Sequence, residues 1–213
     1  MILSHSKKFI FIHNYKVAGT SIQNALIEFD SQKKNPPIFK NKLKRKLGLK
    51  VSPPKLKYHA HIKAKDLKAQ MSKKVFEEYF KFGFVRNPWD WQVSLYTFML
   101  KDAKHHQHEF VKSLKDFDEY IDWRVHHDLH LQKSFFYEEN NCLMDFIGKF
   151  ENINEDFSKI CDLLGIQVAL PYLNRSREDK RFTHFYSQKS IDMIYEAFKE
   201  DIELFNYTKP QLR

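Results

Sequence analysis

The stretch FIFIHNYKVAGTSIQNALIEF, residues 9–29, places a lysine, a glycine and two hydroxyls between a short apolar run and a helical apolar pattern. A strand that enters a loop and then a helix places unpaired backbone N–H groups and the positive helix end at that loop. Gly19 lets the backbone approach a ligand closely, Thr20 and Ser21 add hydroxyl donors, and Lys16 adds a cation. These groups predict a cradle for a phosphate or a sulfate. The alternative is an ordinary strand-to-helix turn capped by Ser21 or Thr20.

The loop does not have the sequence of the cradle in magnesium-dependent ATPases. That pattern is GxxxxGK followed by Ser or Thr, with the lysine after the last glycine and the hydroxyl on the metal. Here Lys16 comes three residues before Gly19, and Asp145 in LMD is a weak candidate for a metal-binding aspartate at a strand end. We therefore expect no metal in this site.

A second segment, YFKFGFVRNPWDWQVSLYTFML, places Arg86 at the end of an apolar strand and Ser94 two turns into the following helix. Arg86 can clamp a phosphate with two N–H groups, and Ser94 can donate from the adjacent helical face. Because ligands collect at the carboxyl ends of parallel strands, we expect Arg86 and the first loop to meet there. Alternatively, Arg86 forms a salt bridge or contacts a carbonyl.

Strands and helices alternate along the chain, which predicts an α/β fold with a central parallel sheet flanked by helices. Asn87 is expected to cap the helix after Arg86, with Pro88 at its first position. The remaining predictions are a short strand in KYHAHI, helix over 65–80, helices and loops over 103–130, a strand in CLMDFIGK before a helix at about 153–164, and one closing helix from about Ile191 to Phe205.

The composition predicts one domain over residues 1–213, with 42% hydrophobic residues and a basic Pro/Lys-rich insertion at about 31–57. Cys142 and Cys161 form no disulfide framework or zinc motif, and we expect buried thiols in a reducing compartment. No run reaches the ~18 apolar residues of a membrane span, and the N-terminus makes a poor signal peptide, so a cytoplasmic location is expected. The net charge of +9 suits a polyanionic partner without identifying it.

The two segments resemble motifs of the sulfotransferases that use 3′-phosphoadenosine 5′-phosphosulfate (PAPS). FIHNYKVAGTSI resembles their 5′-phosphosulfate loop, and FGFVRNPWDWQVSLY resembles their 3′-phosphate segment. The likeness is closer to the carbohydrate branch of Golgi and bacterial enzymes, sulfotransferase family 2. Within that branch, YHAHIKA resembles the histidine segment of the heparan sulfate 2-O-sulfotransferases. The segments IGKFENINEDF and DIELFNY also match the branch in position and character.

This resemblance spans about residues 8–207, interrupted by the insertion, and implies the P-loop-like nucleotide-binding fold of these enzymes. Two positions depart from the usual pattern. The family loop usually has two glycines and a threonine where this chain has Val17 and Ala18, and the family commonly has arginine where this chain has Trp91.

The resemblance implies transfer of a sulfuryl group from PAPS to a hydroxyl of a carbohydrate acceptor, anionic or neutral. It implies that Lys16 contacts the leaving phosphate and the bridging oxygen, and that Arg86 and Ser94 hold the 3′-phosphate. The backbone and hydroxyls that would hold the 5′-phosphate belong to Ala18, Gly19, Thr20 and Ser21. Because a sulfuryl group carries less negative charge than a phosphoryl group, a lysine and N–H groups can stabilise its transfer without a metal.

The acceptor hydroxyl needs a base, and the pKa of histidine suits that role. The resemblance implies His61 as this base. His59 has the same parity on the expected strand, so it assists with the acceptor or packs. In the family a loop near LNRSREDKRFTHFY closes over the nucleotide, and the alternative here is a solvated basic loop. Its candidate residues are Arg175, Ser176, Arg177, Lys180 and Arg181.

Other histidines gather in KDAKHHQHEF and WRVHHDLH, where His126 and His130 have the i, i+4 spacing of some chelating pairs. HExxH is absent, so we expect these clusters to line an acceptor cleft or to face solvent.

Two other functions stay open from the sequence. One is a kinase-like phosphoryl transferase, which requires magnesium and a preference for ATP. The other is a non-catalytic basic module that binds nucleic acid or an anionic membrane through residues 40–57. For a sulfotransferase no nucleic acid partner is expected, and the insertion would tether the protein to an anionic membrane surface or guide an acidic glycan.

Overall fold

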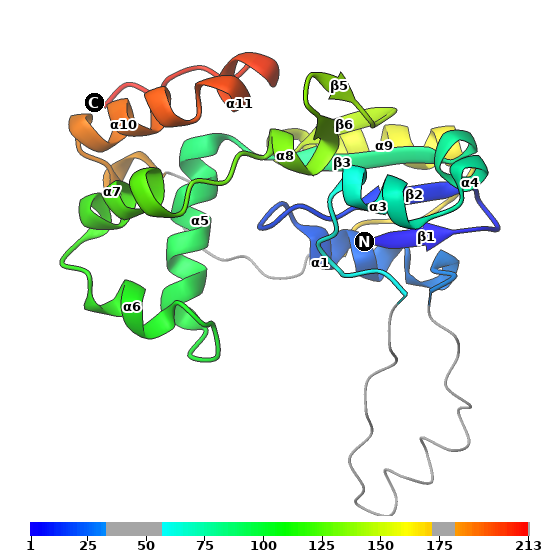
Figure 1. The fold of residues 1–213 in the computed structure, drawn as a ribbon, viewed down its shortest axis with the longest axis horizontal. Coiled ribbons are helices and arrows are strands. Elements are labelled where there is room, and N and C mark those ends of the chain that lie inside the picture. Colours follow the sequence, from blue (N-terminus) through cyan, green and yellow to red (C-terminus); the bar gives the residue numbers. More distant parts are fainter. Residues whose placement is uncertain (33–56, 172–181, 213) are drawn as a thin grey trace, which may run out of the picture.

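A four-stranded sheet of order β1-β2-β3-β6 forms the centre of the protein (Figure 1). The structure is a computed structural model, and it describes residues 1–32, 57–171 and 182–212. Strands β2 (Phe9–Ile12), β3 (Phe80–Val85) and β6 (Phe146–Lys149) run parallel. The α/β fold with a central parallel sheet is confirmed, whereas the edge strand β1 (Ile2–Ser4), antiparallel to β2, was not expected.

Both faces of this sheet are covered, which explains why FIFI and FKFGFV are apolar without alternation. On one face, Ile10 and Ile12 pack with residues of the short helices α3 (Ala64–Gln70), α4 (Lys73–Glu78) and α8 (Lys133–Phe136). On the other face, Phe11 and Phe82 stack with ring centroids 5.3 Å apart and pack with α1 (Gly19–Ala25) and α9 (Ile153–Leu164).

A second region, made of helices, lies beside the sheet and begins with α5 (Pro88–Lys101) directly after β3 (Figure 1). The predicted start of α5 is confirmed, because the Asn87 side chain accepts from the N–H groups of Trp89 and Asp90 and Pro88 is the first residue. The apolar core of this region includes Trp89, Tyr120 and Phe198. Its other helices are α6 (His108–Ser113), α7 (Phe117–His127), α10 (Gln188–Ala197) and α11 (Lys199–Leu204).

Three predicted strands or helices differ from the structure. KYHAHI is not a strand, because bonds from His61 N to His59 Nδ1 and from Ile62 N to the His59 carbonyl turn the chain locally. The helix over 65–80 is broken between α3 and α4, and the closing helix is broken at Phe198 between α10 and α11. The strand β6 and the helix α9 confirm the prediction for that part of the chain.

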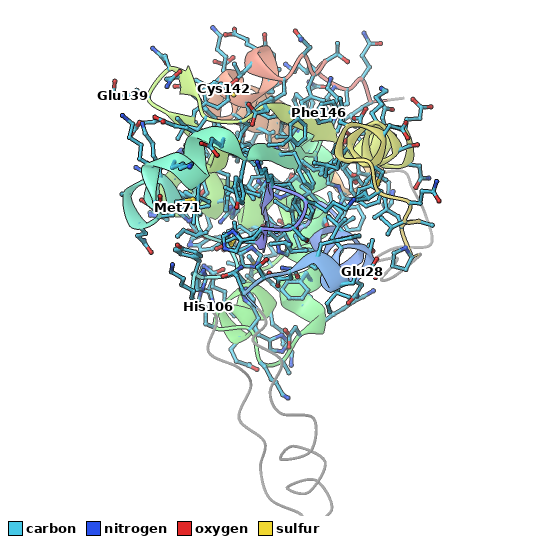
Figure 2. All side chains as sticks on the ribbon, turned by 90° about the vertical axis from the view of Figure 1, so that its right-hand side faces the viewer. Glu28, Met71, His106, Glu139, Cys142 and Phe146 are labelled. Atoms are coloured by element: carbon cyan, nitrogen blue, oxygen red, sulfur yellow. The ribbon has the colours of Figure 1, made fainter. Side chains whose placement is uncertain are left out.

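Among the described residues, the remaining short elements are a two-stranded hairpin and three 3₁₀ turns: β4 (Tyr137–Glu138), β5 (Asn141–Cys142), η1 (Ile27–Phe29), η2 (Phe150–Asn152) and η3 (Thr183–Phe185). The expectation of two buried thiols is wrong for Cys142, which is exposed on this hairpin near Glu139, whereas Cys161 is buried (Figure 2). The hairpin projects from the sheet, so burial of a short apolar side chain is not required there.

Some predictions concern parts of the chain outside the described residues. The insertion expected at about 31–57 lies there almost entirely, and so do Arg175, Ser176, Arg177, Lys180 and Arg181. Across residues 1–32, 57–171 and 182–212, no helix is both long and apolar enough to cross a membrane.

Candidate active site

The loop between β2 and α1 turns through two left-handed residues that are not glycine. Lys16 has φ of 56° and Ala18 has φ of 58°. Ala18 is the N-cap of α1, and no side chain caps the helix. The prediction that Thr20 or Ser21 is the cap is therefore wrong, because the left-handed residue at 18 places both hydroxyls inside the first helical turn.

Gly19 is required by a neighbouring ring, which the sequence reasoning missed. A Cβ atom at Gly19 would lie 1.6 Å from Nε2 of His13, so no larger residue fits unless the ring moves. His13 follows β2 and is only 8% exposed, and burial lowers its pKa to about 2, which keeps the ring neutral. The sequence did contain a signal for a role of His13, because this polar residue directly follows a buried strand.

Lys16 projects toward α5, where its Nζ lies 4.0 Å from the centroid of the Phe98 ring. Burial, together with the smaller effect of the positive charges of Arg86 and Lys101, lowers the pKa of Lys16 to about 8. The loop and α5 therefore concentrate positive charge in a partly buried place. A bound anion would relieve this repulsion.

Arg86 lies at the end of β3 and contacts the same loop. Its Nη1 donates to the Lys16 carbonyl at 2.9 Å, and its Nε donates to Asp90 Oδ2 at 2.6 Å. The guanidinium also stacks on Phe150, 4.1 Å from the ring centroid. The structure therefore brings Arg86 and the first loop together, and Arg86 also makes the salt bridge and the carbonyl contact considered as alternatives.

Ser94 has an unusual environment on α5. Its side chain is fully buried, and its Oγ has no hydrogen-bond partner among the residues the structure describes. Phe98 follows four residues later, so Ser94 lies on the helix face that Lys16 covers. Buried hydroxyls are normally paired. An unpaired one beside Lys16 fits a site that accepts an anionic group.

His61 is in the turn that replaces the expected strand, next to the loop. Its Nδ1 lies 2.9 Å from the His13 carbonyl, and its ring lies 4.3 Å from the ring of Tyr15. Because a carbonyl only accepts, Nδ1 carries the proton and Nε2 is the acceptor. Burial lowers the pKa of His61, which favours this neutral form.

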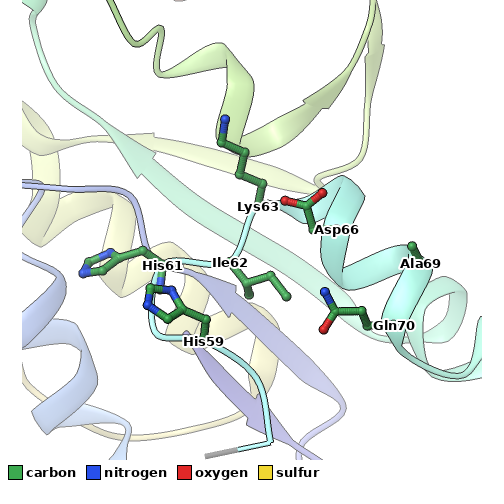
Figure 3. A pocket seen from close by; sticks show the side chains of 7 residues that line it. All are labelled: His59, His61, Ile62, Lys63, Asp66, Ala69 and Gln70. Carbon is green, nitrogen blue, oxygen red and sulfur yellow. The ribbon is translucent and has the colours of Figure 1, made fainter. Parts of the chain in front are cut away.

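An open pocket of about 420 Å³ lies beside His61 (Figure 3). Figure 3 shows the His59 and His61 rings on one side and α3 on the other. His59 is exposed, and its Nδ1 accepts from the His61 N–H. The other lining residues are Ile62, Lys63, Asp66, Ala69 and Gln70.

The residues considered for a metal have other partners. Asp145 lies at the opposite end of the sheet, where it pairs with Lys81 Nζ at 2.8 Å. His126 Nδ1 lies 2.9 Å from the Asp122 carbonyl, and His130 pairs with Asp128. In the described part of the chain, no three His, Cys, Asp or Glu side chains are grouped as metal ligands.

Comparison with known proteins identifies the family. The model of the sulfotransferase family matches residues 1–208. The chain belongs to this family. Carbohydrate sulfotransferase 11 from Mus musculus is 23% identical over 172 residues, which cover 63% of this chain and 48% of that protein. The Rattus norvegicus protein of the same name is also 23% identical over 172 residues, so the chain spans about half the length of both relatives.

A third relative is covered almost completely. An uncharacterized protein from Archaeoglobus fulgidus is 29% identical over 122 residues, which cover 53% of this chain and 91% of that protein. The predicted resemblance to sulfotransferases is therefore confirmed at the level of the family, and the relatives named carbohydrate sulfotransferase 11 support the likeness to its carbohydrate branch.

Proposed function

We propose that this sulfotransferase-family protein transfers a sulfuryl group from PAPS to a hydroxyl of a carbohydrate acceptor. The observation that supports the proposal is the bond from Arg86 Nη1 to the Lys16 carbonyl, which joins the first loop to the end of β3, with Lys16 Nζ over Phe98 of α5. Ser94, one turn before Phe98 on α5, has an Oγ without a hydrogen-bond partner among the described residues. The Mus musculus relative is named a carbohydrate sulfotransferase, which supports the class of acceptor.

The donor would lie between the loop and α5. We assign the 5′-phosphosulfate to Lys16 and to the first turn of α1, with the backbone and hydroxyls of Ala18, Gly19, Thr20 and Ser21. Arg86 and Ser94 would hold the 3′-phosphate. Since Arg86 Nε and Nη1 already contact Asp90 and the Lys16 carbonyl, its other N–H groups are the ones available without rearrangement. Ser176, Arg177 and Lys180 stay candidates to cover the nucleotide.

The chemistry follows from His61 and Lys16. The neutral Nε2 of His61 takes the proton of the acceptor hydroxyl, whose oxygen then forms a bond to sulfur. The bond from sulfur to the bridging oxygen breaks, and its electron pair stays on the leaving 5′-phosphate. Lys16 stabilises the charge that develops there, a role that requires no metal. The products are a sulfate ester, 3′,5′-adenosine bisphosphate and a protonated His61.

The acceptor would occupy the pocket beside His61. Asp66 and Gln70 come from one face of α3 and offer carboxylate and amide groups to sugar hydroxyls, while Ile62 offers an apolar surface. His59 lines the same pocket and would contact the acceptor. Lys63 adds the positive charge that an anionic sugar would need.

Calorimetry with 3′,5′-adenosine bisphosphate, the product nucleotide, tests the donor site directly. We expect metal-independent binding that Lys16→Ala and Arg86→Ala weaken strongly, whereas Lys65→Ala, an exposed lysine on α3, leaves it unchanged. A preference for ATP with magnesium would support a kinase instead. Salt-sensitive binding to nucleic acid or anionic vesicles without nucleotide binding would support a basic module.

A second experiment tests the base. In a screen of oligosaccharide acceptors with PAPS, His61→Ala should lower kcat by about 10² to 10⁴ while bisphosphate binding stays within about twofold. His59→Ala is the matched control, because His59 lines the same pocket and lacks the bond to the His13 carbonyl. Equal losses in both variants would contradict the assignment of His61.

A further inference from the structure

Gln132 is a fully buried side chain at the start of α8, and it joins the ends of two strands. Its Nε2 donates to the Arg86 carbonyl at 2.7 Å, and its Oε1 accepts from the Arg86 N–H at 2.9 Å. The same Oε1 accepts from Asn14 Nδ2 at 3.1 Å. One amide therefore fixes the backbone after β3 and a side chain after β2.

Asn14 transmits this contact into the first loop. It is fully buried, and its Oδ1 accepts from the Tyr15 N–H at 2.7 Å. Tyr15 directly precedes Lys16, whose left-handed backbone offers its carbonyl to Arg86. The bonds of Gln132 therefore reach the backbone on both sides of the contact between Lys16 and Arg86.

Asp201 on α11 holds Gln132 from the opposite side. Its carboxylate is fully buried and accepts from the N–H groups of Gln132 at 2.7 Å and of Lys133 at 2.9 Å. In Figure 1, α8 lies between the sheet and α5. The carboxylate thus connects a helix near the C-terminus to the carboxyl ends of β2 and β3.

We propose that Gln132 and Asp201 are positioning residues of the donor site: Asp201 orients Gln132, and Gln132 sets the relative placement of Lys16 and Arg86. The inference rests on the proposed function, because it treats the meeting of these two cations as the nucleotide site. Small displacements of groups that clamp a ligand weaken binding strongly, since the bonds to a rigid anion depend on geometry. Neither positioning residue needs to touch the nucleotide.

The chain offers a matched control in Gln92, a second fully buried glutamine. Its Oε1 accepts from Arg124 Nε at 3.2 Å and lies 3.4 Å from the Tyr120 hydroxyl. It is therefore as buried as Gln132 and also bonded to an arginine, but its bonds join α5 to α7 and do not involve the loop between β2 and α1. Loss of Gln92, whose Nε2 has no hydrogen-bond partner among the described residues, reports what a buried glutamine that is not bonded to the loop contributes to folding.

The experiment compares Gln132→Leu with Gln92→Leu by calorimetry with 3′,5′-adenosine bisphosphate, at a temperature where circular dichroism shows each variant folded. We expect Gln132→Leu to raise Kd about tenfold or more and Gln92→Leu to change it less than about twofold, with comparable losses of Tm. In a Lys16→Ala background, Gln132→Leu should have a smaller effect on Kd, because its action passes through Lys16.

A milder variant, Asn14→Ser, tests the same link if Gln132→Leu does not fold. Asn14→Ser removes the link to Gln132 while its hydroxyl can still accept from Tyr15, and it should raise Kd several-fold. Equal Kd changes for the Gln132 and Gln92 variants, or an unchanged Kd for Asn14→Ser, would overturn this inference alone. If the wild-type protein binds no bisphosphate, the proposed function fails and this inference fails with it.

Discussion

The two ends of β3 each carry one nearly buried basic residue, and their surroundings differ. At the first end, Lys81 is 7% exposed, donates to the Tyr79 carbonyl at 2.7 Å and pairs with Asp145, which also accepts from the Lys81 N–H. At the other end, Arg86 is 5% exposed and pairs with Asp90. There, however, Lys16 and Lys101 add further positive charge, and burial, together with the charges of Arg86 and Lys101, lowers the pKa of Lys16.

From this difference we expect the carboxyl end, and not the first end, to bind a ligand. The first end neutralises its cation and bonds the backbone, as a purely structural site would. The carboxyl end combines cations with left-handed residues at 16 and 18, and on α5, which follows it, the Ser94 hydroxyl has no partner among the described residues. Each of these features costs stability in the absence of an anion. Helices follow parallel strands at this end, so their N-termini also favour negative charge there.

Exchanging each lysine for methionine should give the largest contrast between the two ends. Lys16→Met keeps an apolar chain over Phe98 but removes the charge, and we expect the Kd for 3′,5′-adenosine bisphosphate to rise about 100-fold. Lys81→Met should leave this Kd unchanged and lower the free energy of unfolding by about 1–3 kcal/mol, because it removes the partner of Asp145. Calorimetry and urea unfolding measure the two effects. Weakened nucleotide binding in both variants would contradict the prediction that only the carboxyl end of β3 binds the nucleotide.

Substitution of two glycines, one at the start of α1 and one after α9, should give a second and smaller difference in nucleotide binding. Gly19→Ala forces the His13 ring to move, so we expect a loss of about 1–3 kcal/mol in unfolding free energy together with weaker nucleotide binding. Gly165→Ala, at φ of 58° with open space around its Cβ, should cost about 1 kcal/mol and leave binding intact. Thermal unfolding and calorimetry on both variants provide the measurement. Unchanged binding in Gly19→Ala would show that the donor tolerates a displaced His13.

The smallest expected effect is a pH dependence specific to the carboxyl end. Because the pKa of Lys16 is about 8 in the free protein, the nucleotide binds the protonated form, and its affinity should fall by up to about tenfold per pH unit above pH 8. The free protein should gain stability over the same range, since the unfolded chain retains the proton that folded Lys16 has lost. Calorimetry from pH 7 to pH 9.5 tests this, and Lys16→Met should remove the dependence. A profile that persists in this variant would assign the titration to another group.

Local signals account for the parts of the fold that the sequence predicted. The strands at Phe9–Ile12 and Phe80–Val85, the capped start of α5 and the pair of β6 and α9 all follow from apolar runs, helical spacing and the Asn87–Pro88 signal. The prediction that Lys16 and Arg86 lie together required one further rule, namely that the carboxyl ends of parallel strands meet at the same edge of the sheet. The strand predicted in KYHAHI is absent because one bond to the His59 side chain and one to the His59 carbonyl turn the segment, which an alternation of apolar residues does not reveal.

The sequence by itself determined the strand, loop and helix order around Lys16, the basic residue after β3 and the family. Only the tertiary structure decided that His13 requires Gly19, that the Ser94 hydroxyl has no partner in the described residues, and that His61 presents Nε2. The same holds for Gln132, which bonds to Arg86 and Asn14 across 46 and 118 residues of chain. Periodicity and capping report contacts within one helical turn or strand, whereas these bonds form only when distant segments pack and exclude water from their polar groups.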